Sequence, residues 1–319
     1  MRWKGRRQST NIRDVRGQSS RGSRRISFPG RRRSTGGNRI RLPGGGSPRR
    51  AGGGGIGIVG LLVIGGIMLL MGMNPLSLLG LGGSGGGGSF APNAPQTQNA
   101  PITANSEQKE FVAVVLAETE DVWNGIFQAN GAVYQEPELV LFSDSVQSAC
   151  GFASSASGPF YCPGDSRIYL DMTFFDELAN RFGASGDFAQ AYVIAHEVGH
   201  HIQNLTGILL DFNTRRRSMS QVEQNRYSVR IELQADCYAG VWGYFTEQRG
   251  LLERGDLQEA LNAATQIGDD TIQRRTRGTI VPESFNHGTS EQRRRWFDKG
   301  FSTGRVEGCD TFTQAYEAL

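Results

Sequence analysis

Residues 187–204 read DFAQAYVIAHEVGHHIQN and contain the pattern His-Glu-x-x-His at His196, Glu197 and His200. Residues four apart on an α-helix lie one turn apart and about 40° apart around the axis, so both imidazoles can face one ion. A tetrahedral zinc site requires this arrangement. Glu197 lies beside the two histidines, where it can hold a water molecule at the metal and take its proton. His201 is rotated by about 140° from His196, and we expect it to flank the site or face solvent.

The composition of this segment predicts a buried helix. Asp187 can cap the N-terminus, and Gln190 three residues later completes an approximate capping box. Apolar residues fill most of the remaining positions from 188 to 198, which favours a central helix. Charged and polar side chains on such a helix need partners, and a metal ion with its water would supply them. The alternative is a pair of ordinary core histidines.

A second segment offers a third ligand. Gln203 and Thr206 stand where a metzincin motif has Gly and His, which excludes that class. Residues 227–246 predict another helix, on which Glu232 can complete a set of two histidines and one carboxylate. Asp236 lies one turn further on the same face and can accept a hydrogen bond from a ligand histidine. Two alternatives remain, namely Asp236 as the ligand itself and Glu232 in a surface salt bridge.

His287 is a further candidate for the site. It lies in SFNHGTSEQRRRWF, just before a helix expected to begin near Thr289. Beside the metal it could donate a hydrogen bond to the oxyanion that develops during hydrolysis. It could equally be a structural loop or capping residue. We expect the arginines at 293–295 to be solvated or salt-bridged rather than to bind substrate.

The remainder of residues 105–319 predicts one folded domain. A helix should begin at Ser106, strands are expected at 138–146 and 167–174, a short helix at 175–182, and a longer one at 258–277. The second strand precedes the metal helix directly, so its edge could bind an extended peptide by strand addition.

The four cysteines predict two disulfides. Cys150 and Cys162 flank a Gly/Ser-rich loop, and pairing them leaves Cys237 to bond with Cys309. Disulfides persist in an oxidising compartment outside the cytoplasm. The alternative is a set of buried free thiols. The chain has no Cys-x-x-Cys pattern, which argues against a structural zinc site.

The N-terminal region differs strongly in charge from the rest of the chain. Residues 1–50 contain 16 of the 34 basic residues but only Asp14 among the 31 acidic ones, so they carry +15 and the remainder −12. Residues 1–54 are rich in Arg, Gly and Ser, and we expect a disordered tail. A solvated tail that helps to fix membrane orientation is favoured, with contact to anionic lipid as an alternative. Nucleic-acid binding is disfavoured because no aromatic or folded RNA-binding pattern is present.

A membrane anchor is expected at residues 55–73. Residues 56–73, IGIVGLLVIGGIMLLMGM, contain no charge and are just long enough to span a bilayer. The basic block before them places the N-terminus in the cytoplasm and the following domain outside. A cleaved signal peptide is the rival interpretation. Residues 74–104 predict a flexible linker.

Three stretches, HEVGHHIQN, ELQADCYAG and SFNHGTSEQRRRWF, together resemble the bacterial putative neutral zinc metallopeptidase family. The resemblance implies one membrane span and an external gluzincin-like domain. It also implies that His196, His200 and Glu232 bind Zn²⁺ and that Glu197 is the catalytic base. The basic tail is longer than the family pattern implies.

We therefore expect an α+β, zincin-like metallopeptidase domain that follows a disordered basic tail and one transmembrane helix. Its function would be zinc-dependent hydrolysis of peptides or proteins outside the cytoplasmic membrane. The alternatives are a non-catalytic metal-binding envelope protein and a protein that binds nucleic acid or anionic lipid through its tail.

Overall fold

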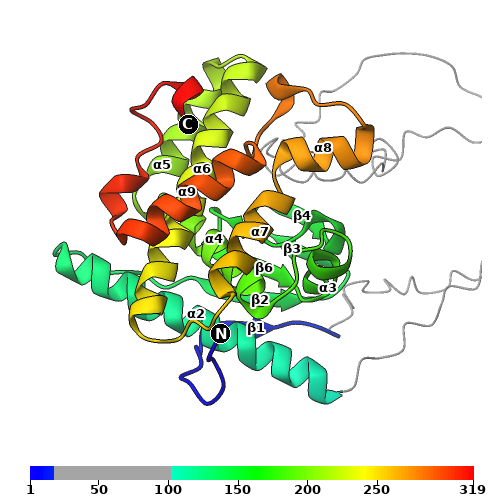
Figure 1. Ribbon diagram of the computed structural model, residues 1–319, viewed down its shortest axis with the longest axis vertical. Helices are drawn as coiled ribbons and strands as arrows, with labels where there is room; N and C mark the ends of the chain where they lie inside the picture. Colours follow the sequence, from blue (N-terminus) through cyan, green and yellow to red (C-terminus); the bar gives the residue numbers. More distant parts are fainter. Residues whose placement is uncertain (18–101) are drawn as a thin grey trace, which may run out of the picture.

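Helix α4 (Asp187–Leu205) runs through the centre of the protein, with most of its side chains buried. The computed structural model describes residues 1–17 and 102–319 (Figure 1). The predicted span at 55–73 lies outside these residues. So does the predicted linker 74–104, except for its last three residues, which already belong to α2 (Ile102–Ala129). Within the described ranges, no helix has both the length and the apolar character needed to cross a membrane.

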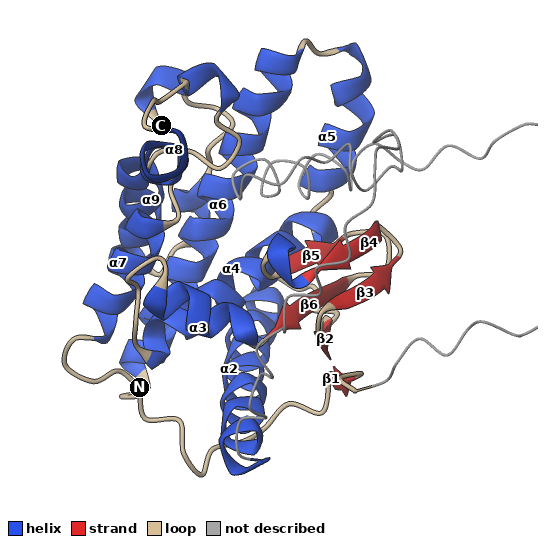
Figure 2. Ribbon diagram, turned by 90° about the vertical axis from the view of Figure 1, so that its right-hand side faces the viewer, coloured by secondary structure: helices blue, strands red, loops and turns tan. Residues whose placement is uncertain are grey.

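The structure is mixed α+β, as predicted, and most of its elements are helices. α2, α4, α6 (Gln221–Gln248), α7 (Asp256–Gln266) and α9 (Ser290–Thr303) form the helical body, and the strands gather on one side of α4 (Figure 2). The shorter helices are α3 (Thr173–Asn180), α5 (Ile208–Arg215) and α8 (Asp269–Arg277). The single helix predicted at 258–277 is in fact α7 and α8. Gly268 lies at the break, where a side chain would overlap the backbone of Ser290.

The N-terminus of α4 is capped differently from the prediction. Gly186, with φ 115°, is the N-cap residue, and Asp187 is the first residue of the helix. The Glu259 side chain from α7 accepts a hydrogen bond from the Phe188 amide at 3.1 Å. A side chain at position 186 would overlap that carboxylate. A residue distant in sequence therefore satisfies the first turn of the helix.

Glycines allow the central helices to approach closely. A Cβ atom added to Gly199 of α4 would lie 2.9 Å from the Ala235 carbonyl oxygen of α6. On the other side of α6, side chains at Gly240 and Gly300 would overlap the backbones of α9 and α6 respectively. Because no Cβ separates them, α4 and α9 pack directly against opposite sides of α6.

The main sheet has the strand order β1-β2-β6-β5, from β1 (Ile12–Asp14), β2 (Glu138–Phe142), β6 (Arg167–Asp171) and β5 (Phe160–Cys162). β1, β2 and β6 are parallel, and β5 runs antiparallel to β6. β3 (Ser145–Ser148) and β4 (Gly151–Ser154) form a separate hairpin. The strand expected to offer an edge, β6, is instead covered by β5. β5 is one edge strand of the described sheet, and β1 is the other.

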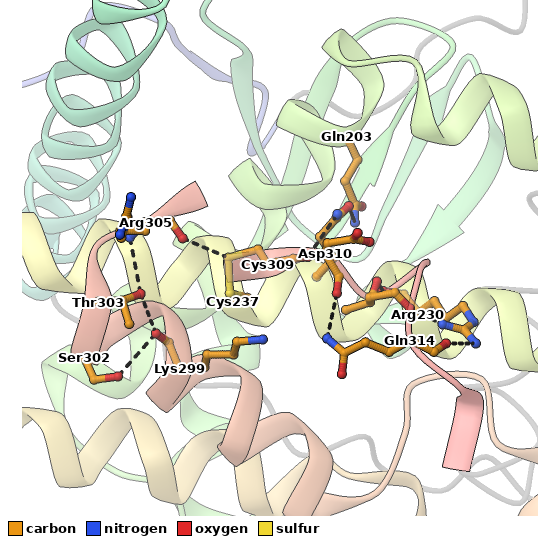
Figure 3. The surroundings of a disulfide bond; sticks show 12 residues. Gln203, Arg230, Cys237, Lys299, Ser302, Thr303, Arg305, Cys309, Asp310 and Gln314 are labelled. Carbon is orange, nitrogen blue, oxygen red and sulfur yellow. Dashed lines mark hydrogen bonds between the residues drawn. A yellow bond between two sulfur atoms is a disulfide. The ribbon is translucent and has the colours of Figure 1, made fainter. Parts of the chain in front are cut away.

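Both predicted disulfides are present. Cys150 bonds with Cys162 beside β5, and Cys237 of α6 bonds with Cys309 in the C-terminal segment. Figure 3 shows the second bond among side chains that fasten the C-terminal segment to α6. Arg230 donates to the Gln314 carbonyl at 2.9 Å, and Gln234 donates to the Cys309 carbonyl at 3.2 Å.

Residues 1–17, here called the N-terminal arm, are ordered against the domain, which corrects the prediction of disorder for this part of the tail (Figure 1). Trp3 is buried and packs edge-on against Phe111 of α2, with ring centroids 5.4 Å apart. β1 pairs with β2 inside the main sheet. The average composition of residues 1–54 concealed the few apolar side chains that dock the arm. Residues 18–54 lie outside the described part of the chain.

Candidate metal and catalytic site

Three side chains with metal-binding atoms meet between α4 and α6. His196 Nε2 lies 3.2 Å from one Glu232 carboxylate oxygen, and His200 Nε2 lies 3.5 Å from the other. One ligand atom from each of the three residues lies within 4.8 Å of those of the other two. Two imidazole nitrogens and one carboxylate form a donor set that suits zinc with an open fourth position. The structure thus brings together the three residues predicted as ligands.

The second ring nitrogen of each histidine has an acceptor. His196 Nδ1 donates to Asp236 Oδ1 at 2.8 Å, and His200 Nδ1 donates to Gln203 Oε1 at 2.9 Å. Donation from Nδ1 fixes the tautomer that leaves Nε2 free to bind a metal. Sequence reasoning found Asp236 but missed Gln203. Its position three residues after His200 was the available signal, since residues three apart are neighbours on a helix.

Asp236 is fully buried and accepts four hydrogen bonds. Besides His196, the Tyr192 hydroxyl donates to Oδ1 at 2.5 Å, and Arg293 of α9 donates to both oxygens at 2.8 and 3.0 Å. Burial alone would raise the pKa of Asp236, but Arg293 and His196 outweigh it and hold the pKa below its usual range. Arg293 is therefore salt-bridged in the core, which agrees with one of its two predicted environments and excludes the solvated one.

The pKa values of His196 and Glu232 are displaced in opposite directions. Burial lowers the pKa of His196, but the neighbouring Asp236 and Glu232 outweigh burial and raise it to about 9. Burial raises the pKa of Glu232, yet His200 and His287 more than offset this and hold it well below its usual range. The site therefore keeps a carboxylate ionised next to imidazoles that a metal would require to be neutral.

Glu197 lies at the same site without a full set of partners. Its side chain is buried, and its Oε2 atom has no hydrogen-bond partner within the described residues. Burial raises the pKa of Glu197, against the opposing effect of His200 and His196. A buried carboxylate oxygen without a partner is costly. A metal ion and water in this position would relieve that cost, so the residues present fit a metal.

His287 approaches the site from the loop before α9. Its Nδ1 donates to Asp269 Oδ1 at 3.1 Å, and Asp269 Oδ2 accepts the backbone amides of Asn286, His287 and Gly288 at 2.7–3.1 Å. Burial lowers the pKa of His287, but Asp269 and Glu232 raise it by more, so it lies above its usual range. Sequence analysis found His287 but not the aspartate that holds it, because Asp269 lies 18 residues earlier in the chain and no local spacing links the two.

His201 is not near the metal-binding atoms, as expected, but it does not face solvent. It is buried, its Nδ1 lies 3.0 Å from the Tyr161 hydroxyl, and its Nε2 lies 2.5 Å from the Gln135 carbonyl. Burial lowers its pKa. His201 thus ties the metal helix to the strand β5 and to the chain before β2.

A cleft of about 880 Å³ opens onto the three ligand-type residues, Glu197, His287 and Arg293. Beyond these polar groups its walls are largely apolar. The apolar lining includes Phe160 of β5, Phe174 of α3, Leu209 and Phe212 of α5, and Ile272 of α8. A largely apolar cleft with a few convergent polar groups is the usual form of a ligand site.

A His-Glu-x-x-His helix that faces a carboxylate from a second helix is typical of metal-dependent hydrolases. Comparison with known families agrees, since the family described as "Putative neutral zinc metallopeptidase" matches residues 1–312. The chain belongs to this family. It is 43% identical over 313 residues to the uncharacterized protein YpfJ of Escherichia coli K12, covering 98% of this chain and 99% of that protein. It is also 40% identical over 233 residues to the uncharacterized protein Rv2575 of Mycobacterium tuberculosis H37Rv, covering 70% and 78%. No solved structure matches.

Proposed function

We propose that this protein is a zinc-dependent metallopeptidase with a zincin-like fold and that it hydrolyses peptide bonds. The observation that carries the proposal is the meeting of His196, His200 and Glu232 beside a buried Glu197 oxygen that has no partner among the described residues. Membership of a zinc metallopeptidase family supports the same activity.

In this proposal His196, His200 and Glu232 hold the zinc ion, and Asp236 and Gln203 orient the two imidazoles. A zinc ion bound there would supply Lewis-acid chemistry to the scissile carbonyl and to the attacking water. Glu197 takes a proton from that water and later gives it to the nitrogen of the leaving amine. Its raised pKa suits both steps, because a carboxylate held in an apolar site is a stronger base than one in water.

His287 is the proposed donor to the oxyanion. Asp269 occupies its Nδ1 and stabilises the protonated ring, which leaves Nε2–H available for the developing negative charge. The amides that Asp269 holds at 286–288 keep this loop fixed. The donor is thereby positioned before substrate arrives.

The cleft favours peptides with bulky apolar side chains near the bond that is cleaved. Phe160, Phe174 and Phe212 supply much of its apolar surface. β5 borders the same cleft and pairs on only one side within the described residues. An extended substrate could add to β5 as a further strand, which would fix its main chain while the apolar walls select side chains.

We place the domain outside the cytoplasm, with residues 55–73 in contact with the membrane. Two disulfides support an oxidising compartment. The membrane contact is supported by the 18 uncharged and largely apolar residues at 56–73.

The test compares the wild-type chain with Glu197→Gln on a quenched fluorescent peptide library. The variant should retain its metal, because the three ligands remain, and lose activity by at least about 100-fold, the scale of a missing general base. Glu177→Gln is the matched control, since Glu177 also lines the cleft but lies outside the metal-binding group. It should cleave at nearly the wild-type rate.

Full activity in Glu197→Gln would show that the base is misassigned. A wild-type protein that binds zinc but cleaves no peptide in the library would favour the alternative of a non-catalytic metal-binding protein.

A further inference from the structure

The N-terminal arm contacts a surface of the domain that offers carboxylates to its cationic groups. The arm begins at Met1, and the α-ammonium group of this residue lies 2.9 Å from the Asp187 carboxylate in the first turn of α4. The same group lies 3.1 Å from both Glu253 and Asp256. These carboxylates belong to α4, to the loop before α7 and to α7 itself. One cation from the arm therefore joins separate parts of the domain.

Buried acids on α2 depend on the arm for partners. Glu120 is 1% exposed, and it accepts hydrogen bonds from Arg7 at 2.9 Å, from Asn11 at 2.9 Å and from Ser9. Glu118 is 2% exposed and pairs with Arg6 at 2.7 Å, sharing its carboxylate with Arg249. An ionised carboxylate buried without partners is strongly destabilising. Without the arm, Glu120 would lose its hydrogen bonds from Arg7, Ser9 and Asn11, and Glu118 would keep Arg249 but lose Arg6.

The arm also contributes to the sheet and the core. β1 forms the parallel edge beside β2, with Ile12 opposite Leu139 and Asp14 opposite Leu141. Met1 and Trp3 are buried in the main apolar core. Parallel pairing requires a long connection between the two strands, so the arm returns to the domain across a large sequence separation.

We infer that the N-terminal arm is an integral part of the catalytic domain and lies on the same side of the membrane as the metal site. A chain that crossed a membrane once between residues 17 and 106 would hold the two on opposite sides and could make none of these contacts. A single crossing therefore cannot separate the arm from α2. This departs from the sequence-based expectation of a cytoplasmic N-terminus with an external domain.

The charges of the arm fit this arrangement. The rule that places basic residues in the cytoplasm counts cations near a span. Arg6 and Arg7 are paired with Glu118 and Glu120, and Lys4 is paired with Glu107 at 2.6 Å. These cations belong to the electrostatics of the domain. They do not form a free basic surface for anionic lipid or nucleic acid.

The Lys4–Glu107 pair provides a direct test in the full chain. Both side chains are exposed, so Lys4→Cys with Glu107→Cys should not disturb the core, and all four native cysteines are held in disulfides. A protease site inserted after Gly86 allows the arm to be cut from the domain. A short bismaleimide added to membranes of expressing cells should keep most of the cut arm attached. The control pairs Lys4→Cys with Arg277→Cys at the end of α8, which lies far from the N-terminus (Figures 1 and 2), and it should keep little.

Labelling with a membrane-impermeant maleimide gives a second measurement that does not require cross-linking. Lys4→Cys and Glu107→Cys, each alone, should be labelled from the same side of intact cells or spheroplasts. Labelling of Lys4→Cys only after permeabilisation, while Glu107→Cys reacts without it, would overturn the inference. Cross-linking of the pair no stronger than that of the control would overturn it as well.

Discussion

The first turn and the middle of α4 carry similar groups with different partners. Near the middle, His196 and His200 meet Glu232, and at the first turn Asp187 meets Asp256 and Glu259. In both groups the ligand-type atoms lie within 4.8 Å of one another. At the first turn, however, the carboxylates already hold the Met1 ammonium and the Phe188 amide. At the other site a buried Glu197 oxygen lacks a partner among the residues that the structure describes. Close acidic groups thus indicate a metal only where the chain's own donors leave them unsatisfied.

We expect the largest effect in the amount of zinc bound when one residue of each group is replaced. The wild-type chain should bind one zinc ion, and His196→Ala should bind almost none because a first-turn cluster filled by an ammonium cannot replace it. Asp187→Asn should keep one ion. Metal analysis of the purified proteins after dialysis decides this. Two ions in the wild type, or loss of the ion in Asp187→Asn, would remove the distinction.

The next effect concerns how closely α4 and α6 approach. Gly199→Ala would place a Cβ 2.9 Å from the Ala235 carbonyl oxygen, so the two helices must separate. Displacing a catalytic group by about 1 Å can cost about 100-fold in rate, and we expect a loss of that order. Gly125→Ala is the control, because nothing lies within 4 Å of that added atom. It should leave activity unchanged and stabilise α2 by about 0.5–1 kcal/mol. Equal activity in both variants would contradict the helix-contact argument.

The sequence predicted what depends on local spacing. His196, Glu197 and His200 follow from helical geometry over a single turn, and Glu232 and Asp236 follow from a second helical pattern of the same kind. The pairing of the cysteines followed from their positions, since one pair flanked a short loop. These features need little knowledge of the tertiary structure.

Features formed by distant contacts escaped prediction. Arg293 reaches Asp236 from 57 residues away, and the Glu259 cap reaches α4 from 71 residues away. β5 was too short to stand out in the sequence, so the sheet edge was assigned to its neighbour. The N-terminal arm was missed because a few buried apolar and paired basic residues lie in an otherwise Arg- and Gly-rich region.

A smaller effect on zinc affinity is expected at Arg293 of α9, which donates hydrogen bonds to Asp236. Arg293→Lys keeps a positive charge but cannot donate to both oxygens of Asp236. Loss of such an outer contact typically weakens metal binding about 10–100-fold, and we expect the lower end because the charge remains. Competition with a zinc chelator measures this. Arg294→Lys, at an exposed position, should bind zinc like the wild type. A matching loss there would point to a general effect on α9.

The smallest effect should appear at the first turn of α4, as a pH dependence of stability. Burial lowers the pKa of the Met1 ammonium, but the hydrogen bonds that it donates to Asp187, Asp256 and Glu253 outweigh burial and raise the pKa from 8.0 to about 10. A raised folded-state pKa means that the stabilisation is complete below pH 8 and is lost as the pH rises towards 10. The melting temperature should fall by a few degrees, on the order of 1 kcal/mol, over this range.

A chain extended by Gly-Ser before Met1 is the control for the pH dependence, because it cannot place an ammonium at this position. Its melting temperature should start lower at pH 7 and change less between pH 8 and 10. Identical pH profiles for the two chains would exclude a role for the Met1 ammonium.

The bond between Arg293 and Asp236 also bears on how the protein is assembled during synthesis. The ligand-type residues leave the ribosome well before α9, since Arg293 lies 97 residues after His196. Until the guanidinium arrives, Asp236 would be a buried anion without its cation, which is unfavourable by several kcal/mol. We therefore expect α4 and α6 to pack around Asp236 only after α9 has been synthesised. A nascent chain halted before α9 would carry every ligand for the ion yet lack a finished place to hold it.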